Sequence, residues 1–107
     1  MANICNTELK ISSEKLDEKK IEEIKQYIKD NYAYCGEIYS DEDFEVNDYM
    51  VIECGTKWNV LTDELVKIAK KFGVDIRAIG REDGVGFIQV VGVSEDGSVY
   101  KDEEIGL

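Results

Sequence analysis

The chain has 107 residues, of which 43% are hydrophobic and 35% charged, a composition that excludes disorder and predicts one globular domain over residues 1–107. Its 24 acidic and 13 basic residues give a formal net charge of −11, which opposes direct binding to nucleic acid or to anionic lipid. It contains no histidine, and this removes the usual general base, the Ser/His and Cys/His nucleophile pairs and the commonest metal ligand.

The first two predicted elements are a strand and an amphipathic helix. Residues 4–11 alternate between apolar and polar side chains, which is the period of a half-buried strand. Over residues 14–32 apolar side chains recur every three or four positions, and lysines and glutamates fill the rest, which predicts a helix with one apolar face. Either Ser13 or Asp17 is expected to cap its N-terminus, because a side-chain oxygen there accepts from an unpaired amide of the first turn.

A second strand and a second helix follow, after a loop in which residues 37–39 are a candidate for a short strand. Residues 49–54 alternate again and predict a central strand. Residues 61–72 carry a second helical stripe, and Gly73 comes where a left-handed C-cap residue is wanted. We therefore expect the second helix to end sharply at this glycine.

A hairpin is predicted next. Residues 74–78 alternate and indicate a strand. Asp83-Gly84 supplies the positive backbone angles of a tight turn. The partner strand is expected over residues 85–93.

The chain is predicted to end with a short strand and an acidic tail. A second turn pair, Asp96-Gly97, leads into a strand near residues 98–101. The acidic cluster that follows is interpreted as a solubilising tail, and it consists of Asp102, Glu103 and Glu104.

The order of these elements, β-α-β-(β)-α-β-β, predicts an α+β fold. It folds most economically as an antiparallel or mixed sheet with both helices packed on one face. Two helices that each bury one stripe cover a single face, so the other face is expected to be solvated. That open face is predicted to carry Glu8, Lys10, Glu53, Asp75 and Arg77. A small apolar spot on it is interpreted either as ordinary exposed side chains or as a dimer or partner contact, and it consists of Ile79, Ile88 and Val90.

The cysteines and the N-terminal residues indicate the setting in which the protein works. Cys5, Cys35 and Cys54 are widely spaced and odd in number, so the sequence predicts reduced thiols and neither a disulfide framework nor a zinc site. The N-terminal residues show no cationic n-region, and no apolar run is long enough to span a membrane. We therefore expect a cytoplasmic protein that is not an enzyme and has no cofactor, no metal and no membrane contact.

The acidic residues are concentrated in one segment. Between Asp30 and Thr56 there are eight carboxylates, four tyrosines and no lysine or arginine. Tyrosine beside carboxylates meets arginine by stacking on the guanidinium plane and by ion pairing. The segment has two interpretations. One is a solvated loop, with half of the tyrosines packed in the core, and the other is a partner-binding surface for a basic protein, formed by Tyr34, Tyr39, Asp41, Glu42, Asp43, Glu45 and Asp48.

Short motifs spread over most of the chain resemble those of one known family. They are Asn3-Ile4-Cys5-Asn6-Thr7, Gly55-Thr56-Lys57-Trp58, Asp75-Ile76-Arg77, Glu82-Asp83-Gly84-Val85-Gly86-Phe87 and Asp96-Gly97-Ser98-Val99. Together they resemble the YubB-like domain of plasmid and phage proteins, although this chain lacks the proline that the family usually has after the tryptophan. The resemblance implies a ferredoxin-like fold and carriage on a mobile genetic element, and it carries over no catalytic residue.

The acidic segment and this resemblance together lead to one functional hypothesis. We expect a non-enzymatic inhibitor from a phage or plasmid that mimics nucleic acid and blocks the basic groove of a host defence complex, with a CRISPR-Cas effector as the main candidate partner. One alternative is a small-molecule binder that sequesters a nucleotide signal, with Arg77, Arg81 and nearby lysines as its cations. Another is a plain assembly module. The protein itself is expected to be a monomer or a homodimer.

Trp58, at the junction between the central strand and the second helix, has two interpretations. It serves either as an interface anchor, since tryptophan is enriched at binding hot spots, or as a core residue over the helix N-terminus. We expect the core position. The nearby glycines Gly80, Gly84 and Gly86 lead into a strand with no lysine after them, so they indicate turns and no phosphate-binding loop.

Overall fold

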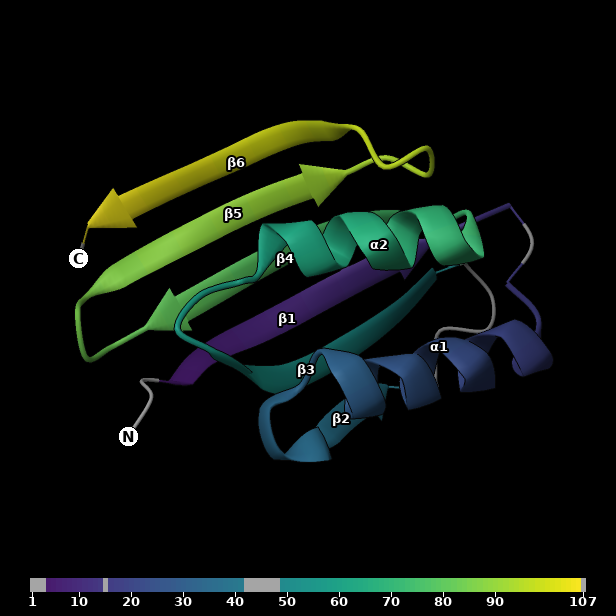
Figure 1. Ribbon diagram of the computed structural model, residues 1–107, viewed down its shortest axis with the longest axis horizontal. Helices are drawn as coiled ribbons and strands as arrows, with labels where there is room; N and C mark the ends of the chain where they lie inside the picture. Colours follow the sequence, from purple (N-terminus) through teal and green to yellow (C-terminus); the bar gives the residue numbers. More distant parts are fainter. Residues whose placement is uncertain (1–3, 15, 42–48, 107) are drawn as a thin grey trace.

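The computed structural model of the protein describes residues 4–14, 16–41 and 49–106 (Figure 1). Within these residues there are strands, two α-helices and a short 3-10 helix. In chain order they are β1 (Ile4–Ser12), α1 (Glu18–Asn31), η1 (Tyr34–Gly36), β2 (Ile38–Asp41), β3 (Tyr49–Lys57), α2 (Thr62–Phe72), β4 (Asp75–Glu82), β5 (Phe87–Val93) and β6 (Val99–Gly106).

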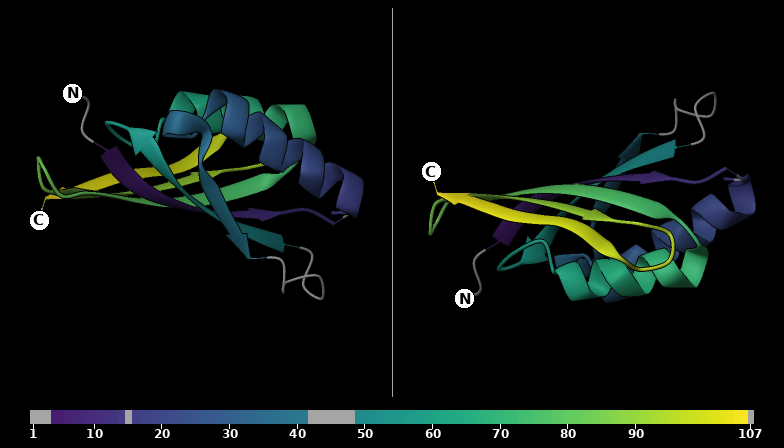
Figure 2. Two further views of the ribbon diagram at one scale, coloured as in Figure 1. Left: turned by 90° about the horizontal axis from the view of Figure 1, so that it is seen from below. Right: turned by 90° about the horizontal axis from the view of Figure 1, so that it is seen from above.

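The strands form one six-stranded sheet in the order β2-β3-β1-β4-β5-β6. Every neighbouring pair in it is antiparallel. Figure 2 shows the sheet edge-on, with both helices on the same side of it. The predicted α+β fold with two helices on one face is therefore confirmed. β1 is central because it pairs with both β3 and β4, whereas β2 and β6 are the edge strands.

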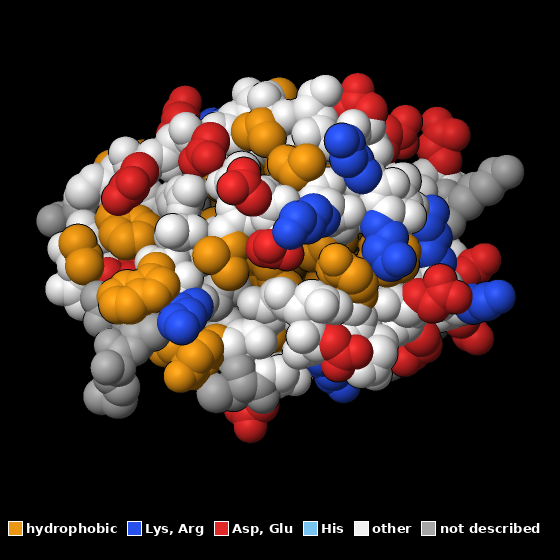
Figure 3. All heavy atoms as spheres, in the orientation of Figure 1, with side chains coloured by type: hydrophobic (Ala, Val, Ile, Leu, Met, Phe, Trp, Pro, Cys, Tyr) orange, Lys and Arg blue, Asp and Glu red, His pale blue; other side chains and the backbone are white. Residues whose placement is uncertain are grey.

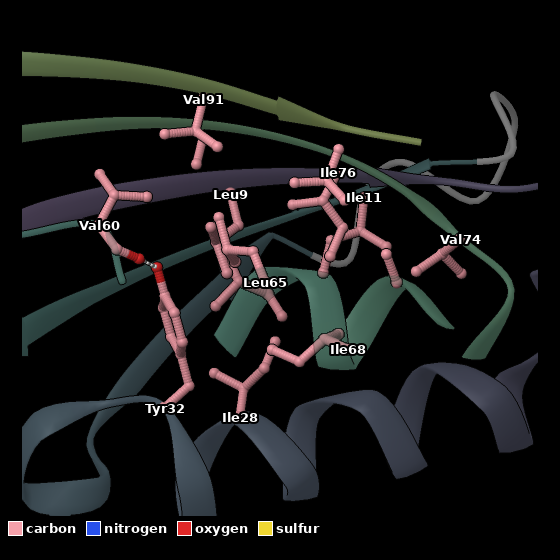
Figure 4. Packing of buried hydrophobic residues seen from close by; sticks show 14 of the residues in the cluster. Leu9, Ile11, Ile28, Tyr32, Val60, Leu65, Ile68, Val74, Ile76 and Val91 are labelled. Carbon is pink, nitrogen blue, oxygen red and sulfur yellow. Dashed lines mark hydrogen bonds between the residues drawn. The ribbon is translucent and has the colours of Figure 1, made fainter. Parts of the chain in front are cut away.

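The core lies between the sheet and the two helices. The side chains of β1 alternate strictly, so that every second one is buried under the helices, as the period of a half-covered strand requires. Figure 4 shows Ile28 of α1 with Leu65 and Ile68 of α2 pointing toward Leu9 and Ile11 of the sheet. All five of these side chains are fully buried.

α1 begins at Glu18, later than the predicted start at residue 14, because Asp17 is its N-cap. The Asp17 carboxylate accepts from the backbone N–H of Lys20 at 2.8 Å. Of the two predicted capping residues, the structure therefore selects Asp17. At the other end of the helix the buried Tyr32 donates its hydroxyl proton to the backbone carbonyl of Val60 (Figure 4). This hydrogen bond connects α1 to the segment that precedes α2.

Two predicted glycine turns are confirmed. α2 ends at Gly73, whose φ is 63° and whose backbone N–H donates to the carbonyl of Ala69. Gly97, with a φ of 88°, lies in the turn that leads into β6. Both angles lie in the left-handed region that favours glycine. Neither α1 nor α2 is long and apolar enough to cross a membrane.

The turn between β4 and β5 differs from the predicted one. The positive φ of 90° falls at Gly86 and not at the Asp83-Gly84 pair. Glu82 is buried, and its carboxylate accepts from the backbone N–H groups of Gly84 and Val85 at 2.7 and 2.6 Å. The turn is therefore stabilised by hydrogen bonds to a buried carboxylate, which the Asp-Gly pattern does not predict.

The last strand is longer than predicted, and the expected acidic tail is wrong. β6 continues to Gly106 and pairs with β5 along its length, so that Asp102, Glu103 and Glu104 belong to the sheet. The Asp102 carboxylate accepts from the Thr62 hydroxyl and from the Gln89 side-chain amide, both at 2.9 Å. This acid therefore connects β6 to the start of α2 and to β5.

The face of the sheet opposite the helices is open, as predicted. The charged side chains predicted to lie on it are exposed except for Asp75, which is partly buried, and they are Glu8, Lys10, Glu53, Asp75 and Arg77. The predicted apolar spot is also present there. Ile79 is 54% exposed, and Ile88 and Val90 are partly buried.

Candidate protein-binding site

Three of the predicted partner-binding residues lie in strand β2 or just before it. Tyr34 belongs to η1 and Tyr39 to β2, and they are 43% and 66% exposed. Asp41 is the last residue of β2. The remaining predicted acids lie outside the described residues, in the connection between β2 and β3, and they are Glu42, Asp43, Glu45 and Asp48.

Tyr34 and Tyr39 meet at one hollow of the surface. The hollow is open to solvent and has a volume of about 430 Å³. Its lining comes from η1, β2, β3 and β1, and comprises Ile4, Tyr34, Glu37, Ile38, Tyr39, Glu53 and Gly55. We call it the tyrosine hollow. Two aromatic rings and two carboxylates therefore share one small surface, which is the combination that suits a guanidinium group.

Gly55 lets Ile4 approach the backbone of β3 closely, because the glycine has no side chain. A Cβ atom built on it would lie 2.8 Å from Cγ2 of Ile4, a distance that real Cβ atoms do not tolerate. A larger residue at this position would displace Ile4 and fill part of the hollow. The close approach of Ile4, and not a turn, therefore accounts for the glycine.

Glu53 reaches the hollow because of the register of the sheet. Ile52 and Cys54, on either side of it, contribute to the core, so the alternation of β3 places Glu53 on the open face. It lies opposite Tyr39 in β2 and opposite Glu8 in β1. Like charges directly opposite each other on neighbouring strands are destabilising. A cation bound beside Glu53 would relieve this repulsion.

A second hollow of about 540 Å³ adjoins the first on the open face, and Glu53 lines both. Its lining comprises Asn6, Thr7, Glu8, Glu53, Cys54, Ile79 and Arg81. Arg81 pairs with Asp83, with Nε 2.8 Å from Oδ1. The second hollow therefore carries charges of both signs, whereas the charged side chains that line the tyrosine hollow are acidic.

The carboxylates of the tyrosine hollow do not belong to the ion pairs formed between described residues. Those pairs join Lys25 to Glu22, Lys67 to Glu64, Arg81 to Asp83 and Lys101 to Glu103. None of them uses Glu37 or Glu53. The negative charge at the hollow is therefore not neutralised by these pairs, and it contributes to the field that a basic partner meets.

The thiols that the structure describes are poor nucleophiles. Burial raises the pKa of the partly buried Cys54 thiol to about 12, and the neighbouring Cys5 thiol adds to the shift. Burial also raises the pKa of Cys5, although hydrogen bonds with Thr7 and Thr56 oppose the change. Both groups are protonated near neutral pH, and thiols react as thiolates. The side chain of Cys35 lies outside the described part of the chain. Across residues 4–14, 16–41 and 49–106, no group of three or more Cys, Asp or Glu side chains is arranged to hold a metal ion.

The prediction that Trp58 packs in the core is wrong. Its side chain is 50% exposed, and its backbone has a φ of 76°. The core position at this junction belongs to Val60, which is fully buried. Its N–H donates to the side-chain carbonyl of Gln89 and its carbonyl accepts from Tyr32. The buried position is therefore occupied two residues after the tryptophan.

Sequence reasoning does not identify Ile4, Glu37, Glu53 and Gly55 as members of one site. The two acids are recognisable as part of the acidic segment, and the alternation around Glu53 assigns it to the open face. Their meeting with Ile4 depends on the pairing of β1 with β3, in which Ile4 lies opposite Lys57. That pairing joins residues far apart in the chain, and no local pattern specifies it.

Comparison of the chain with protein-family models, with curated proteins and with solved structures found no match. The resemblance to the YubB-like domain therefore stays a prediction. A proposal about function accordingly depends on the geometry of the tyrosine hollow.

Proposed function

We propose that this protein binds an arginine-bearing, basic surface of another protein through the tyrosine hollow and the acidic segment beside it. The observation that carries the proposal is the meeting of Tyr34 and Tyr39 with Glu37 and Glu53 around one solvent-open hollow. Aromatic rings stack on the planar guanidinium group, and carboxylates accept its paired N–H groups. The net charge of −11 adds a longer-range attraction to a basic partner.

The sequence of the acid-rich connection between β2 and β3 supports our proposal of a larger acidic surface. β2 ends at Asp41, two residues after Tyr39, and the sequence places four further carboxylates before β3 begins at Tyr49. Because β2 and β3 pair antiparallel, the two residues that bound this connection, Asp41 and Tyr49, lie at the same end of the two strands. We propose that this surface competes with nucleic acid for a basic groove, such as that of a CRISPR-Cas effector, and thereby inhibits the partner.

The strand order supports a ferredoxin-like assignment for the first four strands. α1 connects β1 to β2 and α2 connects β3 to β4, and these strands lie in the order β2-β3-β1-β4. We propose that this β-α-β-β-α-β unit belongs to the ferredoxin-like class. Strands β5 and β6 then extend the unit beyond β4. The assignment agrees with the fold that the YubB-like resemblance implies.

Binding of fluorescent peptides, measured by anisotropy, tests the proposed function. An arginine octapeptide is expected to bind more tightly than a lysine octapeptide of equal charge, because only the guanidinium group stacks on tyrosine in a planar, bidentate geometry. Binding of both is expected to weaken as salt screens the charges. Replacing Tyr39 and Glu53 together (Tyr39→Ala, Glu53→Gln) is expected to lower the affinity for the arginine peptide by about tenfold.

The matched control is the double variant Tyr100→Ala, Glu104→Gln in β6. It removes an exposed tyrosine and one negative charge, but on the opposite edge strand. This control therefore lowers the long-range attraction by the same amount and leaves the tyrosine hollow intact. Equal losses of affinity in the two double variants, or equal affinity for the arginine and lysine peptides, would contradict the assignment of the hollow as the binding site.

A further inference from the structure

Trp58 has a backbone conformation that is unfavourable for a residue with a side chain. Its φ of 76° lies in the left-handed region, where the Cβ atom of any L-residue crowds the following carbonyl oxygen. Glycine adopts this region without that cost. The strain is not offset by full burial of the indole, which is 50% exposed. The position would therefore suit glycine, yet it holds the chain's one tryptophan.

The loop that carries Trp58, between β3 and α2, is fixed by its other residues. The backbone carbonyl of Asn59 accepts from the Thr56 hydroxyl at 2.5 Å, and its side-chain oxygen accepts from the N–H of Leu61 at 2.6 Å. Val60 is fully buried within the core. These contacts hold the backbone that follows Trp58 in place. A strained residue that its surroundings hold in place is a sign of a functional constraint.

The backbone of Trp58 comes close to residues that line the tyrosine hollow. Lys57, the residue before it, pairs with Ile4 of β1, and Ile4 lines the hollow and is 37% exposed. Gly55, which also lines the hollow, precedes Trp58 by three residues, a separation of roughly 10 Å along an extended chain. Figure 3 shows the other face of the molecule, the one covered by the helices, and there exposed hydrophobic side chains gather toward the left end, where β6 finishes in Figure 1.

We infer that Trp58 is a preorganised contact residue, against which an apolar side chain of the partner packs while an arginine of the same segment occupies the tyrosine hollow. This inference rests on the proposed function. The acidic hollow selects the arginine by charge, and the indole with the neighbouring Ile4 selects the apolar residue by burial. The separation of about 10 Å corresponds to about three residues of extended partner chain.

Two synthetic peptides test this partner chemistry. One is Leu-Gly-Gly-Arg-Gly-Gly-Leu, which presents leucine three positions from the arginine in both chain directions. The other has serine in place of both leucines. The leucine peptide is expected to bind about tenfold more tightly, since one buried leucine contributes that order of affinity. It is also expected to shift the emission of Trp58 to shorter wavelength, because the indole loses contact with water.

The variants Trp58→Gly and Trp58→Ala separate a contact role from a packing role. Glycine relieves the positive φ, so Trp58→Gly is expected to keep the wild-type Tm or raise it. Trp58→Ala retains the strain without the indole, and its Tm is expected to be about 4–8 °C below that of the glycine variant. Each variant is expected to bind the leucine peptide no more tightly than the serine peptide. The anisotropy of labelled peptides measures both affinities.

Two outcomes would overturn the inference. A Tm of Trp58→Gly as low as that of Trp58→Ala would assign the indole to packing, and a leucine preference that survives in Trp58→Gly would assign the apolar contact to other residues. The proposed function itself is tested by Glu53→Gln. If this substitution lowers the affinity of neither peptide, the proposed function is wrong. If the affinity of both peptides depends on Glu53 and leucine brings no gain, the proposed function stands and only the role of Trp58 fails.

Discussion

Cys54 lies on the side of β3 that faces the helices, and burial raises the pKa of its thiol to about 12. At about pH 8 its thiolate fraction is then roughly 10⁻⁴, far below that of an ordinary cysteine. We expect Cys54 of the native protein to react with iodoacetamide at least about a hundredfold more slowly than in denaturant, where the ordinary pKa returns. Proteolytic digestion and mass spectrometry measure this rate separately from those of the other cysteines.

The same pKa shift makes stability depend on pH in the alkaline range. Below the ordinary pKa of 9.0 the thiol is protonated in both the folded and the unfolded chain, so it does not affect the pH dependence there. Between pH 9.0 and about 12 the unfolded chain releases the proton first, and the free energy of unfolding therefore falls. Rapid labelling of native Cys54 at about pH 8 would contradict the burial that causes both effects.

Single residues are predictable from the sequence where a local pattern determines their role. Gly73 follows a helical stripe, and its left-handed conformation is as expected. Trp58 is not predictable in this way, because Val60 takes the buried position through a hydrogen bond with Tyr32, 28 residues away in the chain. The role of Glu82 is not predictable either. Its buried carboxylate accepts hydrogen bonds from the backbone of the turn, and the turn therefore differs from the expected Asp-Gly geometry.

At the scale of elements, the start of α1 offers a direct test of helix capping. Replacing Asp17 by alanine removes the acceptor for the Lys20 N–H and is expected to lower the free energy of unfolding by about 1 kcal/mol. Urea denaturation followed by circular dichroism measures this change. The control Asp17→Asn keeps a capping oxygen and is expected to be close to wild type. Equal destabilisation by both substitutions would indicate that the charge, and not the cap, matters.

The elements themselves are predictable from periodicity except at two places. β1, β3 and both helices have strong patterns, and their predicted centres agree with the structure. β2 is short and extends beyond the expected residues 37–39, to Asp41, because its pairing with β3 sets its length. β6 lacks an apolar pattern over Asp102 to Glu104, and its strand conformation comes from pairing with β5 along a charged sequence.

For the whole molecule, the net charge of −11 leads to a prediction about salt. Repulsion among the carboxylates destabilises the compact state, and added salt screens that repulsion. We expect the urea midpoint to rise as sodium chloride increases from about 10 to about 500 mM. A parallel titration of the charge-neutralising variant Glu8→Gln, Glu53→Gln is expected to show a smaller rise. A midpoint that falls with salt would show that attractive ion pairs dominate.

The overall architecture is predictable as a class, but the site is not. The sequence predicts only two helices, each with one apolar face, and two such helices cover a single face of the sheet. The structure has one covered and one open face, as expected (Figure 2). The order β2-β3-β1-β4-β5-β6 depends on contacts between β1 and two distant strands. This strand order brings Ile4 next to Gly55 in the tyrosine hollow. Local sequence patterns therefore predict the tyrosines of the hollow but not its other lining residues.

The acidic residues of β6 also affect how copies of the protein meet one another. The sheet order ends at β6, so within the described residues no further strand pairs with the outer side of its backbone. Such an edge is a template for strand addition and fibril growth. Asp102, Glu103 and Glu104 occupy consecutive positions in the middle of this strand. Two copies aligned antiparallel about the middle of this strand would place carboxylate against carboxylate, and this repulsion would oppose extension of the sheet by a second copy.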